Sequence, residues 1–284
     1  MKKYCLDLRV SDLERLNNRY VLIRLTTDDG TLLPEMAAGQ FVEVRVDGEP
    51  STFLRRPISI NFVNREQNEL WLLVAVVGAG TRRLAQLQAG DRLNCVLPLG
   101  RGFATLTEMV PPIAEGAPRF LLVGGGVGVA PLLYQGAELA RQGADVTFLL
   151  GARSACDLLL LDEFKKYGRV CVTTEDGTMG EQGFVTNHSV LREERFDMVQ
   201  CCGPTPMMKA VVKYAWEADV DCQVSLENMM ACGLGACLCC VEKVRQLEVD
   251  GQETVHNVCV CKDGPVFAKE ELLWAKWQGN KVTK

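Results

Sequence analysis

Closely spaced cysteines near the C-terminus constrain this chain more than any other feature. Of its thirteen cysteines, seven fall between Cys222 and Cys261. The first residues, MKKYCLDLRVSDLERL, lack the apolar core of a signal peptide, so we expect a reducing, cytoplasmic location. Clustered thiols in such a compartment indicate metal ligation rather than disulfide cross-links.

The spacing Cys232-x4-Cys237-x2-Cys240 is that of plant-type 2Fe-2S ligands. Two glycines in this loop allow the backbone to wrap closely and to turn N–H groups toward the sulfurs. The surrounding segment has no core-sized apolar pattern. We therefore expect residues 221–284 to form a small C-terminal 2Fe-2S domain that depends on its cluster to fold.

The fourth ligand stays open on spacing alone. Cys259 and Cys261 are both suitable, and Cys239 is also near. Zinc held by four cysteines is the main alternative, although a zinc ribbon does not require the glycine loop. Rieske ligation is excluded because His188 and His256 are the only histidines and neither forms a Cys-x-His pair.

Residues 1–106 have the pattern of an antiparallel β-barrel. Val42, Val44 and Val46 alternate with polar residues before a turn, as in a half-buried strand. Similar apolar runs recur at short spacing without a long amphipathic helix between them. These further expected strands are Tyr20–Thr26, Leu70–Val77 and Arg92–Leu97.

Two motifs in this segment suit a dinucleotide diphosphate. Arg56-Pro57-Ile58-Ser59 places a guanidinium and a hydroxyl on a rigid extended strand. Downstream, Gly78-Ala79-Gly80-Thr81 offers a backbone turn and a hydroxyl that complete an anion site. Each motif taken alone also fits an ordinary barrel turn.

Residues 107–220 change to alternating apolar strands and helices, which predicts an α/β domain with a parallel sheet. After the first strand, GGGVGVAP opens a helix in the spacing Gly126-x-Gly128-x-x-Pro131. Such a turn lets backbone N–H groups approach a pyrophosphate, although close packing alone can also explain it. The expected strands are Phe120–Val123, Val146–Leu150, Val170–Thr174 and Met198–Cys201.

A second turn follows the last of these strands. Cys202-Gly203-Pro204 precedes an expected helix over Thr205–Glu217 and should face the glycine loop. A cysteine at this position is either a small core residue or a contact for a nicotinamide.

Together these motifs resemble the ferredoxin-reductase superfamily over residues 10–220. Arg56 to Ser59 is similar to its flavin-binding RxxS motif, Gly126 to Pro131 to its nicotinamide loop, and Cys202 to Pro204 to its CGP turn. The resemblance implies a barrel that binds FAD and a second domain that binds NAD. It also implies FAD contacts at Gly80 and Thr81, and a catalytic role for Cys202.

The tail narrows the resemblance further. MACGLGAC followed by CKDGPVF is similar to the electron-transfer subunits of two-subunit, NAD-linked dihydroorotate dehydrogenases. That similarity implies Cys261 as the fourth ligand, together with Cys232, Cys237 and Cys240. It further implies a separate FMN-containing catalytic subunit, a heterotetramer with that partner, and a role in pyrimidine biosynthesis.

The chain departs from these subunits before its Gly-Thr turn. Where they carry an aromatic residue and an arginine, it has Val74 and Ala75. Backbone contacts from Leu73, Val74 and Ala75 to FAD remain possible, whereas one phosphate partner is missing. Arg82 or Arg83 is a candidate replacement.

The three sites form a circuit, because FAD exchanges two electrons with a nicotinamide and single electrons with a cluster. Rival functions are the small subunit of another flavin and 2Fe-2S complex, such as an NADH-dependent ferredoxin:NADP oxidoreductase or a sulfide dehydrogenase. More remote is a non-catalytic zinc scaffold. The net charge of -5 without a basic run excludes nucleic acid, and no segment predicts membrane insertion.

The last residues offer one further expectation. In the stretch Glu270 to Trp277, Leu273 and Trp277 lie four residues apart, as on one face of an amphipathic helix. Such a helix would contact either the partner subunit or its own domain.

Overall fold

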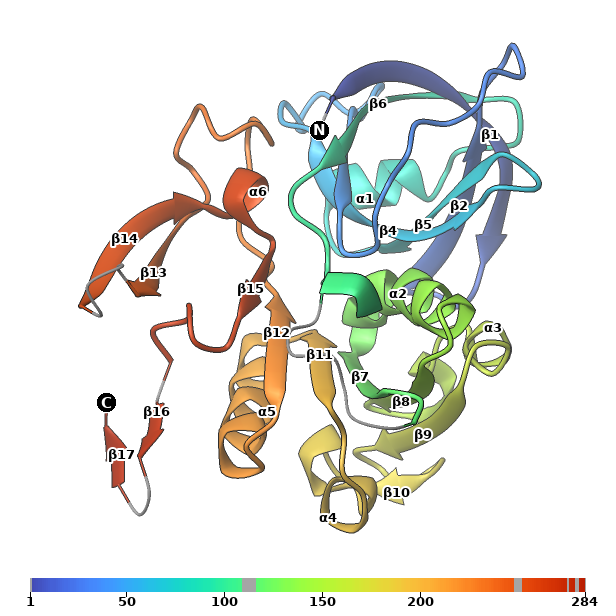
Figure 1. Ribbon diagram of the computed structural model, residues 1–284. Coiled ribbons are helices and arrows are strands. Elements are labelled where there is room, and N and C mark those ends of the chain that lie inside the picture. The colour runs from blue at the N-terminus through green and yellow to red at the C-terminus, as the bar shows by residue number, and fades with distance from the viewer. Residues whose placement is uncertain (1, 109–115, 248–251, 275, 279–280, 284) are drawn as a thin grey trace.

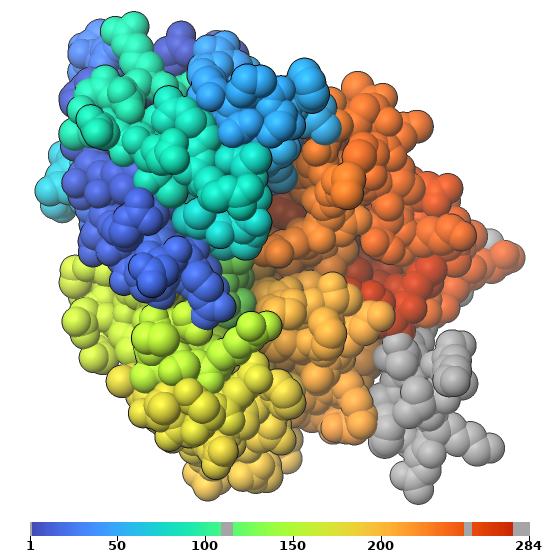
Figure 2. Space-filling view, turned by 180° about the vertical axis from the view of Figure 1, so that it is seen from behind, coloured from blue at the N-terminus to red at the C-terminus, as the bar shows by residue number. Residues whose placement is uncertain are grey.

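The computed structural model describes residues 2–108, 116–247, 252–274, 276–278 and 281–283. A β-barrel, a parallel sheet flanked by helices and a cysteine-rich segment follow one another along the chain (Figure 1). The space-filling view from behind shows the three parts packed directly against one another (Figure 2).

The N-terminal part is a closed six-stranded barrel in the order β1-β2-β5-β4-β3-β6, with all pairs antiparallel, as expected. Val42 and Val44 point into its core, since alternate residues of a strand face the same side. A short helix, α1 (Ala79–Leu84), closes one end. The strands are β1 (Tyr4–Arg15), β2 (Tyr20–Thr26), β3 (Phe41–Val44), β4 (Arg56–Asn64), β5 (Glu69–Ala75) and β6 (Arg92–Leu99).

The middle part is a parallel sheet with helices on its faces, which confirms the predicted α/β fold. All four predicted strands form, and the predicted helix over Thr205–Glu217 is α5. The strands are β7 (Arg119–Gly125), β8 (Asp145–Ala152), β9 (Arg169–Thr174), β10 (Glu181–Gln182) and β11 (Met198–Cys202). The connecting helices are η1 (Leu106–Glu108), η2 (Gly126–Val129), α2 (Ala130–Arg141), η3 (Ala155–Asp157), α3 (Leu161–Phe164), η4 (Val185–Asn187) and α4 (Val190–Glu193).

The cysteine-rich segment is joined to this sheet. The sheet order is β10-β9-β8-β7-β11-β12-β15, so β12 (Asp221–Ser225) and β15 (Val266–Ala268) complete one edge. Between them lie the cysteine loop, the hairpin of β13 (Val241–Leu247) and β14 (Glu253–Cys259), and α6 (Val260–Asp263). That residues 221–284 form a separate domain, with a boundary between residues 220 and 221, stays a prediction.

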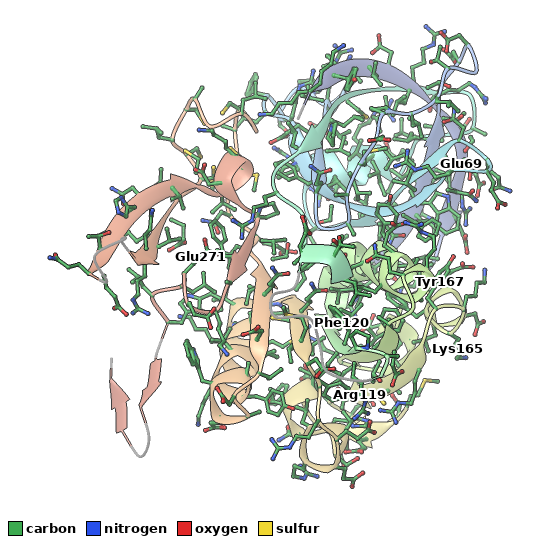
Figure 3. The ribbon with its side chains drawn as sticks, in the orientation of Figure 1. Glu69, Arg119, Phe120, Lys165, Tyr167 and Glu271 are labelled. Atoms are coloured by element: carbon green, nitrogen blue, oxygen red, sulfur yellow. The ribbon has the colours of Figure 1, made fainter. Side chains whose placement is uncertain are left out.

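The expected helix over Glu270 to Trp277 is wrong for the described residues of that stretch. Glu271 instead accepts a hydrogen bond from the Ala268 N–H, and its own carbonyl accepts the Arg245 N–H at 2.7 Å. Glu271 thus lies beside the hairpin (Figure 3), and Leu272 bridges to Val244. These local bonds replace a helical turn, and β16 (Lys276–Gln278) and β17 (Lys281–Thr283) follow as a small hairpin.

None of the described helices is both long enough and apolar enough to cross a membrane.

Candidate functional site

A cavity of about 300 Å³ opens where the three parts of the chain meet. The barrel contributes Phe41, Ile58 and Ser59 to its wall, the glycine loop contributes Val127, and the cysteine-rich segment contributes Met230. Most of this lining is apolar, with a few hydroxyls, as expected for a pocket that holds a flat aromatic ring system. The RxxS motif therefore faces the nucleotide loop across one cavity.

The two predicted anion-binding motifs of the barrel lie together. Arg56 begins β4, and its Nε lies 3.0 Å from where a Cβ would stand on Gly80, so the guanidinium packs closely against the backbone of α1. The Thr81 hydroxyl accepts the N–H groups of Val77 and Gly78 at 2.9 and 3.0 Å. Arg56 and the start of α1 thus form a corner with a fixed cation and a tight backbone turn, which fits the diphosphate of FAD.

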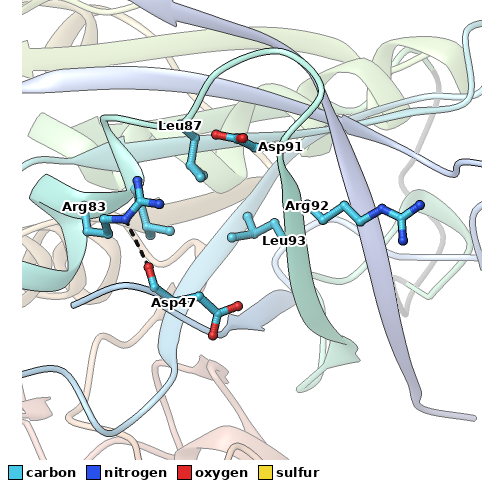
Figure 4. A pocket seen from close by; sticks show the side chains of 7 residues that line it. Asp47, Arg83, Leu87, Asp91, Arg92 and Leu93 are labelled. Carbon is cyan, nitrogen blue, oxygen red and sulfur yellow. Dashed lines mark hydrogen bonds between the residues drawn. The ribbon is translucent and has the colours of Figure 1, made fainter. Parts of the chain in front are cut away.

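In β5 the chain has Val74 and Ala75 where the resembling subunits carry an aromatic residue and an arginine. Leu73 and Ala75 line the cavity, whereas Val74 points into the barrel core. Arg83, one of the two candidate replacements, donates a hydrogen bond from Nε to the Asp47 carbonyl oxygen at 3.0 Å (Figure 4). It lines a separate cavity of about 100 Å³ with Asp91, and that cavity shares no residue with the larger one.

The glycine loop packs directly on the Cys202–Gly203 turn. A Cβ on Gly128 would lie 2.5 Å from both the Cys202 carbonyl oxygen and the Gly203 Cα. Gly126 adopts a φ of +57°, which favours glycine, and Pro131 lies in the first turn of α2. The predicted nucleotide residues are therefore brought together at the carboxyl ends of β7 and β11, where such sheets bind ligands.

Cys202 is buried at the end of β11, and burial raises the pKa of its thiol well above the ordinary value. The thiol is thus neutral and suited to contact rather than to nucleophilic attack. Ser225 and Glu227 lie close by, and the negative charge of Glu227 raises the same pKa further. Both residues line the cavity, and no sequence pattern pointed to them because they lie at and just after the end of a different strand, β12.

A polar network, which no sequence motif indicated, lies at the ends of β8 and β9. The Asp176 carboxylate accepts hydrogen bonds from the Thr178 N–H and hydroxyl at 3.1 and 2.6 Å. The Thr178 hydroxyl also accepts the Ala155 N–H at 2.9 Å and lies 3.4 Å from the Ser154 hydroxyl. An acidic group therefore stands beside the residues that follow β8, although β8 itself ends without one.

The first two cysteines of the loop form one pair. Cys232 Sγ accepts the N–H groups of Leu234, Ala236 and Cys237 at 3.3, 3.4 and 3.5 Å and interacts with the Cys237 thiol. These backbone hydrogen bonds, chiefly from Leu234 and Cys237, lower the pKa of Cys232 to about 6. The loop thus favours a thiolate, as a metal ligand requires.

The other two predicted ligands form a second pair. Cys261 donates its N–H to Cys240 Sγ at 3.4 Å, and their thiols interact. Cys261 Sγ also accepts the Gly235 N–H at 3.2 Å, whereas Cys259 Sγ points to the Gly235 carbonyl oxygen at 3.8 Å. One backbone donor thus faces Cys261 Sγ, whereas the thiol of Cys259 faces an acceptor. Burial, together with the Cys240 thiol, nevertheless raises the pKa of Cys261.

The arrangement of the four thiols fits an iron-sulfur cluster. Two pairs of cysteines, Cys232 with Cys237 and Cys240 with Cys261, are joined by a glycine loop. In a 2Fe-2S cluster two cysteines bind each iron, so each pair would hold one iron. Within the part of the chain that the structure describes, no three His, Cys, Asp or Glu side chains are placed to hold one metal ion.

Comparisons with known proteins agree with this geometry. Residues 227–273 match the family model for the iron-sulfur cluster binding domain of dihydroorotate dehydrogenase B. Residues 122–213 match the oxidoreductase NAD-binding domain. Both matches fall on the segments where the structure places the cysteine pairs and the glycine loop.

Solved structures share the fold. A structure of the NADH-dependent reduced ferredoxin-NADP oxidoreductase superposes with a TM-score of 0.76 and 31% identity, over 94% of this chain and 90% of that one. Phthalate dioxygenase reductase, a modular protein for electron transfer from pyridine nucleotides to [2Fe-2S], gives a TM-score of 0.59 over 89% and 76% of the two chains. At 21% identity, the second likeness concerns the fold alone.

Curated relatives are similar over most of their length. The dihydroorotate dehydrogenase B (NAD(+)), electron transfer subunit, of Shouchella clausii is 40% identical over 86% of this chain and 90% of its own. The corresponding subunit of Caldanaerobacter subterraneus is 42% identical over 83% and 87%. These relatives and family models support an oxidoreductase subunit that uses FAD, NAD and a 2Fe-2S cluster as cofactors. The chain belongs to the family of electron transfer subunits of NAD(+)-linked dihydroorotate dehydrogenase B.

Proposed function

We propose that this chain relays electrons from an FMN-containing dihydroorotate dehydrogenase subunit, through a 2Fe-2S cluster and FAD, to NAD+. The observation that supports it best is the shared cavity, whose wall includes Met230, two residues before the ligand Cys232. Flavin, nicotinamide and cluster would thus meet at one place. Electron transfer in pyrimidine biosynthesis, in the cytoplasm, is the corresponding physiological role.

The residues of the chain bind and orient rather than react. Arg56, Gly80 and Thr81 would hold the diphosphate of FAD, and Pro57, Ile58 and Ser59 would face its ring system. The backbone of Leu73, Val74 and Ala75 would support the same ring, and Cys202 would contact the nicotinamide. When bound, FAD exchanges hydride with the nicotinamide and single electrons with the cluster.

The nucleotide is NAD(H) rather than NADP(H) in this proposal. The adenosine end would extend from the Gly126–Pro131 loop over the ends of β8 and β9. There the Asp176 carboxylate stands beside Ser154, where it would accept hydrogen bonds from ribose hydroxyls and repel a 2′-phosphate. Arg153 is adjacent, but the neighbouring acid opposes a phosphate site.

Exposed apolar side chains near the cluster loop support a partner subunit. Met229 is 80% exposed, Leu234 47% and Leu238 63%, and all three lie within the segment that contains the ligand cysteines. Large apolar side chains that remain exposed together commonly mark an interface. Docking here would bring the partner's flavin close to the cluster, and we propose a heterotetramer with two chains of each kind.

A second candidate is the small subunit of an electron-bifurcating ferredoxin-NADP oxidoreductase. The TM-score of 0.76 at 31% identity favours it, because the similarity covers nearly the whole chain. The two candidates share fold and cofactors and differ only in the partner.

Reconstitution with an FMN-containing dihydroorotate dehydrogenase subunit tests the proposal. The chain would be mixed with the FMN-containing subunit and supplied anaerobically with dihydroorotate and NAD+, while NADH formation is followed by absorbance. We expect NADH only when both subunits are present, and native mass to correspond to two copies of each. If the mixture forms no complex and no NADH while the isolated chain still oxidises NADH, the partner belongs to the second candidate.

A further inference from the structure

Glu43 is a buried acid without a hydrogen-bonding partner. It lies in β3 between Val42 and Val44, which face the barrel core, so its side chain lies on the outer face with that of Phe41. The side chain is fully buried, and among the described residues neither carboxylate oxygen has a hydrogen-bond partner. Buried carboxyl groups are normally paired, because desolvation without compensation is unfavourable. Glu43 is therefore an exception among buried acids.

The cysteine loop covers this acid. A Cβ on Gly233 would lie 2.6 Å from Glu43 Cγ, 3.2 Å from Glu43 Oε1 and 3.0 Å from Leu99 Cδ1. Gly233 has a φ of +65° and directly follows the ligand Cys232. The barrel thus touches the first turn of the cluster loop through the side chain of Glu43.

The charges around Glu43 leave its carboxyl group only partly compensated. Arg55 donates from Nη1 to the backbone carbonyls of Glu43 and Asn94 at 3.2 and 3.1 Å, and not to the carboxylate. Burial raises the pKa of Glu43 to about 7; the positive charges of Arg55 and Arg56 oppose this rise, and Cys232 adds to it. At a pH well above 7 the group is therefore an anion in a medium that screens charge poorly.

The position of Glu43 links the two redox sites. Phe41, on the same face of β3, lines the flavin cavity, and Glu43 supports the cluster loop two residues later. Two residues of a strand span roughly 7 Å. A charge at this point is closer to the cluster loop than to the flavin cavity, so it affects their potentials unequally.

We propose that Glu43 is a positioning residue of the electron relay, which holds the Cys232–Gly233 backbone against the barrel and lowers the reduction potential of the cluster with its carboxylate. The inference rests on the proposed 2Fe-2S site and deepens it. A negative charge fixed beside the cluster disfavours the added electron, so the cluster passes electrons to the flavin more readily.

Redox titration of the purified holoprotein tests this role. The cluster would be titrated anaerobically at a pH well above 7 and followed by electron paramagnetic resonance, in the wild type, Glu43→Gln and Glu43→Asp. We expect the Gln variant to keep its iron and FAD but to titrate at a higher potential. At a fixed ambient potential its ratio of reduced to oxidised cluster should rise about tenfold, as expected for one unit charge at nanometre distance and an effective dielectric constant near 20. The Asp variant should stay near the wild type.

Glu69→Gln is the matched control. Glu69 lies on the side of the barrel away from the cysteine-rich segment (Figure 3), where it accepts a hydrogen bond from the Ser11 hydroxyl at 2.7 Å. Removing its charge should leave the potential of the cluster unchanged. If Glu43→Gln does not accumulate, Glu43→Met removes the same charge together with the unpaired polar atoms.

Each result has one meaning. A potential equal to that of the wild type, in either folded variant that lacks the carboxylate, overturns the inference, as does an equal shift in Glu69→Gln. If the wild type itself holds no 2Fe-2S cluster, the proposed function fails instead, and the two failures are thereby distinguished.

Discussion

Cys259 and Cys261 are only two residues apart, and the surroundings of their thiols differ. Cys261 Sγ accepts a backbone N–H and interacts with the thiol of Cys240, whereas Cys259 Sγ faces a carbonyl oxygen. Spacing could not separate them, because both reach the loop along the chain. The start of α6 at Val260 separates the two thiols, and the position of Cys261 beside Cys240 supports the prediction that Cys261 is the fourth ligand.

We predict that Cys261→Ser loses most of the cluster and keeps FAD, because a hydroxyl is a poor iron ligand. Iron content and the visible spectrum of the purified variant measure this directly. Cys259→Ser is the control and should retain at least half of the wild-type iron. A full cluster in Cys261→Ser would show that Cys259, and not Cys261, is the fourth ligand.

His188 gives the chain a predictable response to acid. Its Nδ1 accepts the Val190 N–H at 3.1 Å, which requires an unprotonated nitrogen, and burial lowers the pKa of His188 despite the opposing charge of Glu181. The unfolded chain therefore binds this proton more readily than the folded one. The contribution to stability is complete above the ordinary pKa of 6.5 and is lost as pH falls through the lower folded value.

Urea unfolding at a series of pH values tests this response. The free energy of unfolding should fall less steeply below pH 6.5 in His188→Gln than in the wild type. Identical slopes in the two proteins would show that His188 does not contribute to the acid response.

At the scale of elements, the strands were predictable and the polar ends of strands were not. Alternation in β3 and the apolar runs of β2 and β7 depend on local sequence, which burial against one core enforces. The network of Asp176, Thr178 and Ser154 depends on which strands become neighbours, and a sequence does not state that. The expected helix after Glu270 was wrong for a similar reason, since contacts with β13 decide the conformation there.

The network at β8 and β9 predicts the choice of nucleotide. Asp176→Asn should bind NADPH about tenfold more tightly, because one like charge near the 2′-phosphate is removed, while its affinity for NADH changes little. Dissociation constants measured by quenching of protein fluorescence test this expectation.

Asp29→Asn provides the control for this change. Asp29 accepts hydrogen bonds from the Thr31 N–H and hydroxyl at 3.0 and 2.7 Å in the same kind of turn, but in the barrel. The Asp29→Asn variant should bind NADH and NADPH with the same dissociation constants as the wild type. Unchanged NADPH binding in Asp176→Asn would place the adenosine end elsewhere.

At the scale of the whole molecule, the order of segments predicted the circuit but not its geometry. Motifs for flavin, nucleotide and cluster follow one another in the sequence, and each of the three segments contributes residues to the wall of one cavity. The contact of Glu43 with Gly233 joins residues 190 positions apart, so no local pattern announces it. The sequence predicted a small cluster domain over residues 221–284 but not that β12 and β15 of this segment extend the parallel sheet.

In the proposed relay, the nicotinamide, FAD and the 2Fe-2S cluster of this one chain exchange electrons, so added NADH should reduce the iron by the reverse path. Anaerobic titration of the isolated, purified protein with NADH tests it most directly, with absorbance and electron paramagnetic resonance recorded at each addition. We predict that the flavin bands bleach and that the signal of a reduced 2Fe-2S cluster grows, with one cluster per chain. Protein that contains zinc without iron, or a flavin that bleaches while the iron stays oxidised at every NADH concentration, would contradict the relay.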